Sequence, residues 1–124
     1  MRRNKKYILS VLLLILTFLF GVNSVLAAPA DDFVITVKTD NAGTSSNTEF
    51  TIPTSSNYTY NYNVDCDDDG TDEATGQTGD YTCTYATAGT YTIRIKDNVG
   101  DGSGFPTIKF NNGGDKDKLL SIDQ

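Results

Sequence analysis

Residues 90–96 read TYTIRIK, in which Tyr91, Ile93 and Ile95 alternate with polar or charged side chains. Successive side chains of a β-strand point to opposite faces, so this period of two predicts a half-buried strand with its apolar side chains turned inward. The same alternation occurs elsewhere in the chain, at residues 33–38, 49–52, 58–66, 81–85 and, briefly, 107–110. The sequence therefore predicts at least six short strands.

Turn-forming Gly, Asn, Asp and Ser fill the segments between these strands, and no segment has the period of a helix. The core has to be built from Tyr, Phe, Ile and Val, because Trp is absent. Many short strands joined by turns predict an all-β fold, an antiparallel sandwich of the immunoglobulin-like type. We expect this domain at residues 28–118 and a short apolar tail at residues 119–124.

The N-terminus carries the pattern of a secretory signal. Four basic residues precede an uncharged apolar run at residues 7–20, and small residues follow it. We expect a signal-peptide helix at residues 1–27 with cleavage after Ala27. An uncleaved anchor is the alternative, but the run is shorter than the roughly 20 residues that span a bilayer. The mature chain is expected to be secreted or held at the cell surface, without membrane insertion.

Removal of the leader leaves six Lys and Arg residues against sixteen Asp and Glu residues, a net charge of −10. That charge repels nucleic acid and anionic membranes, and it favours divalent cations as partners. His is absent, so a Ser or Cys nucleophile has no conventional base. We therefore expect no enzymatic activity.

Cys66 and Cys83 are the only two cysteines, and the alternation places both on inward faces of strands. In an exported chain this predicts a disulfide. A redox pair and a metal site are the alternatives, but the spacing is not C-x-x-C and no His could complete a zinc site.

An acidic run, DCDDDGTDE at residues 65–73, matches the first half of a calcium-binding loop, D-x-D-x-D-G. The candidate ligands are Asp65, Asp67, Asp69, the carbonyl of Thr71, and Glu73. The twelfth position is Gly76 rather than Glu, so a closing carboxylate would have to come from Asp72, Asp80 or elsewhere. The alternative is a solvated acidic turn; repulsion among six carboxylates in nine residues favours calcium.

Three further patterns have simpler alternatives. Residues 97–104 are either a second acidic cradle or an ordinary turn. Residues 57–59 form an N-glycosylation sequon. Tyr58, Tyr60 and Tyr62 share one face of the strand expected at residues 58–66, so we assign them to the core, with a sugar-stacking platform as the alternative.

Two segments, YNVDCDDDG at residues 62–70 and YATAGTYTI at residues 85–93, resemble the PKD domain. The likeness is closer to the PKD-like modules that precede leucine-rich repeats in bacterial BspA-type surface proteins. It covers residues 38–45, 51–54, 69–71, 89–92, 110–115 and 118–123. The resemblance implies a β-sandwich and makes residues 119–123 the lead-in to a first repeat. It also marks a departure, because members of that kind carry Trp in place of Cys66 and His in place of Cys83.

These patterns together predict a non-catalytic, extracellular structural or interaction module of a surface protein, stabilised by calcium. Its expected partner is an extracellular protein or a glycan. The alternatives are a carbohydrate-binding or adhesin-type module, and an inert remnant of a longer surface protein.

Overall fold

The computed structural model of the chain describes residues 32–124, and the expected signal peptide at residues 1–27 lies outside them. Seven strands follow one another: β1 (Phe33–Lys38), β2 (Glu49–Ile52), β3 (Tyr62–Asp65), β4 (Ala74–Gln77), β5 (Tyr81–Thr84), β6 (Thr90–Asp97) and β7 (Leu119–Ile122). One 3-10 turn, η1 (Lys116–Lys118), precedes β7. Over residues 32–124 no helix is long and apolar enough to cross a membrane.

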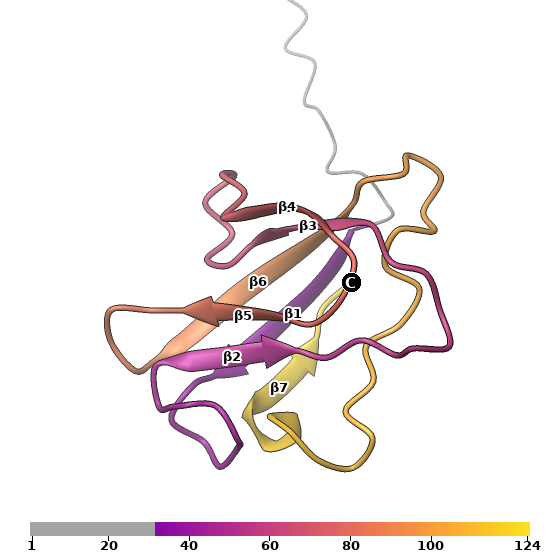
Figure 1. Cartoon of the computed structure of the whole chain (residues 1–124). Helices are drawn as coiled ribbons and strands as arrows, with labels where there is room; N and C mark the ends of the chain where they lie inside the picture. The colour runs from indigo at the N-terminus through magenta and orange to yellow at the C-terminus, as the bar shows by residue number, and fades with distance from the viewer. Residues whose placement is uncertain (1–31) are drawn as a thin grey trace, which may run out of the picture.

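The strands form two antiparallel sheets. One has the order β4-β3-β6-β1-β7, and the other pairs β2 with β5. Figure 1 shows the β2–β5 pair lying in front of the larger sheet, across β6 and β1. The predicted all-β antiparallel sandwich is confirmed.

The core lies between the sheets and is centred on β6, which pairs with β1 on one side and β3 on the other. Ile93 of β6 lies opposite Ile35 of β1, and Ile95 lies opposite Val64 of β3. All four side chains are fully buried, together with Phe50 of the smaller sheet. The alternation at residues 90–96 thus correctly predicted which side chains of β6 point into the core.

A disulfide joins Cys66, directly after β3, to Cys83 in β5, as predicted. It crosslinks the two sheets. The hydroxyl of Tyr85 adds a second connection, because it donates a 2.6 Å hydrogen bond to the carbonyl oxygen of Cys66. Both contacts tie the small sheet to the start of the acidic loop.

Two predicted strands differ from the structure. The strand expected at residues 58–66 is only β3, because the backbone before Tyr62 forms a turn in which the Tyr58 amide donates to the Ser55 carbonyl oxygen. Residues 107–110 form no strand, although Ile108 and Phe110 pack against the core. The alternation at residues 107–110 therefore reflects burial of Ile108 and Phe110 against the core and not pairing in a sheet.

Two strands were not predicted. β4 directly follows the acidic run at residues 65–73 and pairs with β3, and β7 lies in the expected tail and pairs with β1. The backbone beyond β7 also bonds to β1, since the amide of Val34 donates to the carbonyl oxygen of Gln124. Residues 119–122 are therefore a strand of the larger sheet, and Asp123 and Gln124 continue its backbone hydrogen bonding to Val34.

Candidate functional sites

The acidic loop between β3 and β4 is shaped by Asp65, the last residue of β3. Its side chain is buried and accepts hydrogen bonds from the backbone amides of Asp69, at 3.1 Å, and Gly70, at 2.9 Å. Gly70 has a φ of +94°, which favours glycine, and Asp68 has a φ of +57°, which Asp tolerates better than most residues. The sharp turn foreseen from the D-x-D-x-D-G pattern is present.

Three of the five predicted ligands converge. One carboxylate oxygen from each of Asp65, Asp67 and Glu73 lies within 4.8 Å of the other two. Asp69 is not in this group, and its carboxylate accepts a 2.7 Å hydrogen bond from the Thr71 amide. Asp69 and Thr71 thus stabilise the turn in this structure. Glu73 Oε2 accepts a hydrogen bond from the Cys66 backbone amide, which fixes the Glu73 side chain beside the end of β3.

Two cations on β6 partly neutralise the acidic loop. Lys96 Nζ lies 2.7 Å from Asp72 Oδ1 and 3.4 Å from Asp65 Oδ2. Burial disfavours the Lys96 charge, but these carboxylates outweigh it and raise the pKa of the ammonium. Arg94 Nε contacts Asp68 at 2.6 Å. The carboxylate repulsion that favoured calcium is consequently smaller than the sequence alone indicated.

The second acidic segment, residues 97–104, is a turn organised by one side chain. The Asp97 carboxylate accepts four backbone amides, those of Val99, Gly100, Gly102 and Gly104, at 2.6–3.0 Å. These hydrogen bonds lower the pKa of Asp97 to about 2. Among residues 32–124, the group of three acidic side chains close enough to hold a metal ion lies in the acidic loop and not in this segment, which favours the ordinary-turn interpretation over a metal cradle.

Asp115 and Lys118 are two buried charged residues that the sequence pattern did not predict. Asp115 accepts the amides of Thr44, Ser45 and Thr51 at 2.8–2.9 Å. Lys118 Nζ donates to three carbonyl oxygens, those of Ser45, Ser46 and Glu49, at 2.6–3.0 Å. Burial raises the pKa of Asp115, but the hydrogen bonds from Ser45 and Thr51 outweigh it, and the net shift is downward. This network is structural, and it anchors the segment before β7 to the β1–β2 loop.

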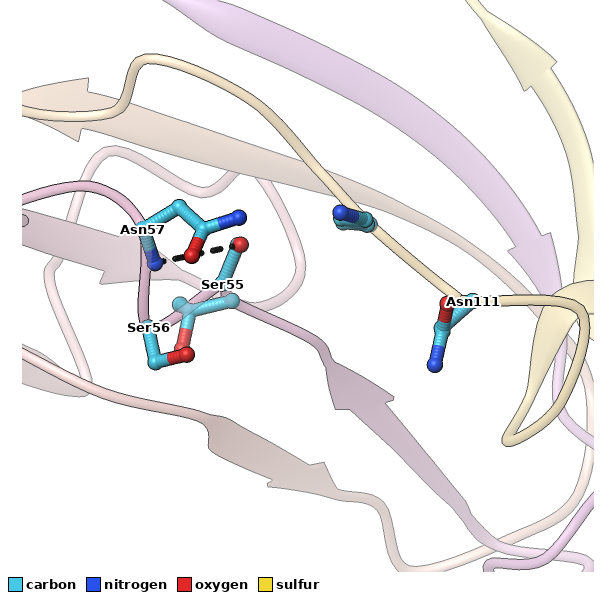
Figure 2. A pocket seen from close by; sticks show the side chains of 6 residues that line it. Ser55, Ser56, Asn57 and Asn111 are labelled. Atoms are coloured by element: carbon cyan, nitrogen blue, oxygen red, sulfur yellow. Dashed lines mark hydrogen bonds between the residues drawn. The ribbon is translucent and has the colours of Figure 1, made fainter.

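The connection between β2 and β3 lines two shallow clefts. The first, of about 220 Å³, is lined by Thr54, Ser55, Ser56, Asn57, Lys109 and Asn111. Figure 2 shows Asn111 across from Ser55, Ser56 and Asn57, on a separate segment of chain. The second, of about 250 Å³, is lined by Tyr58, Thr59, Tyr60, Asn61, Val99, Ser103, Gly104 and Pro106.

The three tyrosines do not form a common platform. Tyr60 and Tyr62 are buried, whereas Tyr58 is 54% exposed at the second cleft, near Val99, which is 51% exposed. Assignment to the core is therefore correct for Tyr60 and Tyr62 and wrong for Tyr58, which lies in the turn closed by its own amide and the Ser55 carbonyl oxygen.

Comparison of the chain with protein-family models, with curated proteins and with solved structures finds no match. The resemblance of residues 62–70 and 85–93 to the PKD domain stays a prediction.

Proposed function

We propose that the mature chain is a PKD-like module that serves as a non-catalytic scaffold and binding surface outside the cell. The observation that carries this proposal is the Cys66–Cys83 disulfide between the two sheets of a small domain. Disulfides persist in oxidising compartments, and small exported domains use them to supplement a thin core. The signal-like pattern at residues 1–27 points the same way.

The chemistry of the side chains favours binding over catalysis. The sequence has no His, and both thiols are held in the disulfide. General acid–base and nucleophilic catalysis most often use those groups.

Export and oxidation can be tested together. Expression of the full chain in a secreting bacterial host should give a product that begins at Ala28 and resists thiol alkylation until it is reduced. Retention of the leader, or two thiols that react without reduction, would contradict the proposal.

We also propose that the acidic loop binds calcium through Asp65, Asp67 and Glu73. Hard carboxylate oxygens are the ligands that calcium prefers, and water would complete the six to eight that it takes. The Glu73 carboxylate keeps one oxygen free of the Cys66 amide. Competition from Lys96 for Asp65 argues for weak affinity, about 0.1–1 mM, as in other extracellular modules.

Thermal unfolding with and without calcium tests this site. At 10 mM calcium and a Kd of about 0.5 mM, linkage gives about 2 kcal/mol, or roughly 8–15 °C in a domain of this size. The shift should disappear in Asp67→Asn and persist in Asp117→Asn, an exposed aspartate on η1. Equal unfolding midpoints in calcium and in chelator would contradict calcium binding by the acidic loop.

A second candidate function, carbohydrate binding, is favoured by one observation: Tyr58 is exposed at the rim of the second cleft. Aromatic rings present an apolar face on which a sugar ring can stack. A glycan array should give specific hits that Tyr58→Ala abolishes. Leu120→Ala, which trims an equally exposed apolar side chain on β7, is the matched control and should keep them.

A further inference from the structure

Lys109 is unlike the other cations of the domain. Within residues 32–124, Lys38, Arg94, Lys96 and Lys116 each form an ion pair, and Lys118 is buried against carbonyl oxygens. Lys109 is exposed and forms none, although Asp and Glu greatly outnumber Lys and Arg in the mature chain. Its ammonium group is therefore available to a ligand, and it belongs to a residue that lines the first cleft.

The two walls of this cleft are held together from inside the domain. The buried Tyr60 hydroxyl accepts a 3.1 Å hydrogen bond from the Ser55 amide and donates a 3.0 Å hydrogen bond to the Thr107 carbonyl oxygen. The Lys109 amide donates to the Pro53 carbonyl oxygen at 3.3 Å. Residues 53–57 and 107–111 are thus fixed relative to each other before any ligand arrives, which lowers the entropic cost of binding.

The lining of the cleft is entirely polar. Ser56, Asn57 and Asn111 are exposed, so the Ser56 hydroxyl and the two carboxamides offer hydrogen-bond donors and acceptors to a ligand. Figure 2 shows the Ser55 hydroxyl accepting the Asn57 amide, which leaves the Ser55 proton available. Asn111 has a φ of +50°, a conformation that Asn adopts more readily than most residues.

One carboxylate touches the wall of the cleft. Asp80 Oδ1 accepts both the amide and the hydroxyl of Thr54 at 2.7 Å. Asp80 is not itself among the residues that line the cleft, and Lys109 is the one charged residue among them. A volume of about 220 Å³ lies below the roughly 300–1,000 Å³ of pockets for drug-sized ligands, so the cleft suits one small group.

From these observations we propose that the cleft binds a carboxylated sugar, with the carboxylate on the Lys109 ammonium and sugar hydroxyls on Ser56, Asn57 and Asn111. Carboxamide and hydroxyl side chains suit a polyol, because each of these groups can both donate and accept hydrogen bonds. None of the residues that line the cleft is apolar, which disfavours an apolar peptide side chain as the ligand. This site goes beyond the scaffold role, and it depends neither on calcium nor on the Tyr58 cleft.

The test is an NMR titration of the mature, disulfide-bonded domain, produced without N-glycosylation because Asn57 begins a sequon. The probes are methyl glucuronide and methyl glucoside, which differ in the carboxylate. We expect amide shifts at residues 54–57 and 109–111 and about fivefold tighter binding of the glucuronide. Lys109→Gln should remove that preference, and Lys116→Gln, the same change on η1, should keep it.

Three outcomes would overturn the proposal: equal affinity for the two glycosides, an equal loss in Lys116→Gln, or sulfate binding in the cleft as tightly as the glucuronide. The last would indicate a general anion site. Tyr58→Ala separates this inference from the second candidate function, because glucuronide binding in the polar cleft should survive it. The Lys109→Gln spectrum outside the cleft reports whether that variant is folded.

Discussion

At the scale of single residues, the stability of this domain depends on charged side chains that replace backbone pairing. Asp115 and Lys118 are fully buried, and between them they satisfy three amides and three carbonyl oxygens of the β1–β2 loop and β2. Backbone groups buried without partners are costly, so these two residues allow an irregular loop to pack beneath the segment before β7.

Removal of the Asp115 carboxylate should therefore destabilise the domain strongly. Asp115→Ala leaves the three amides unpaired and the Lys118 charge uncompensated, and we expect a loss of about 3–5 kcal/mol in the free energy of unfolding. Urea denaturation measures it. Asp117→Ala, two residues away and exposed, is the control and should change stability by less than about 0.5 kcal/mol. Similar losses in both variants would refute the role of Asp115.

Gly104 illustrates a different residue-scale constraint, the close approach of two backbones. A Cβ at this position would overlap the Asn61 carbonyl oxygen and the Asp97 carboxylate. The Asn61 amide also donates to the Gly104 carbonyl oxygen, so the backbone has little room to retreat. We expect Gly104→Ala to cost about 1–3 kcal/mol by overpacking. Gly79→Ala, with open space around its Cβ position, should be nearly neutral when thermal midpoints are compared.

Alternation alone identified Ile93, Ile95 and both cysteines as core residues, since each inward face is a local property of the chain. It could not identify the partners of Arg94 and Lys96. Arg94 pairs with Asp68 and Asp32. Lys96 pairs with Asp72 and Asp65. All of these carboxylates lie far from β6 in the sequence, so only the folded chain brings them together. The burial of Asp115 and Lys118 was equally inaccessible, because both are residue types that are almost never fully buried.

At the scale of elements, the smaller sheet is the weaker part of the fold. A two-stranded pair is at best marginally stable alone, and β2–β5 has only four paired positions. The strands missed by the sequence analysis, β4 and β7, lie at the two edges of the larger sheet. Edge strands bury few side chains, so their alternation is weak; β4 reads Ala-Thr-Gly-Gln and has no fully buried residue.

The disulfide should accordingly protect the smaller sheet more than the larger one. In Cys66→Ala/Cys83→Ala we expect a loss of about 3 kcal/mol for a loop of 17 residues. Hydrogen exchange should show the amides of β2 and β5 losing more protection than those of β1 and β6, because the crosslink joins β5, and through it the small sheet, to the end of β3. Uniform loss of protection across all four strands would mean that the sheets unfold as one unit.

At the scale of the whole molecule, the charges predict a stability plateau bounded at both ends of the pH range. In the folded state, hydrogen bonds hold the pKa values of Asp40, Asp97, Asp101, Asp115 and Asp123 below the ordinary 3.8. The folded protein then binds fewer protons than the unfolded chain near pH 3, so acid favours unfolding. Burial raises the pKa values of Tyr62 and Tyr85 well above 10, and alkali favours unfolding for the opposite reason.

Urea midpoints measured across pH should therefore be flat between about pH 5 and 9, since the sequence has no His to titrate there. They should fall below about pH 4 and again above about pH 10. The Asp97 contribution is present above pH 3.8 and is lost as the pH falls toward its folded pKa of about 2. Asp97→Asn should lower stability on the plateau and flatten the acid limb, whereas Asp117→Asn should leave the limb as steep as in the unaltered chain. An acid limb of unchanged slope in Asp97→Asn would show that the four amides around this carboxylate do not couple its charge to folding.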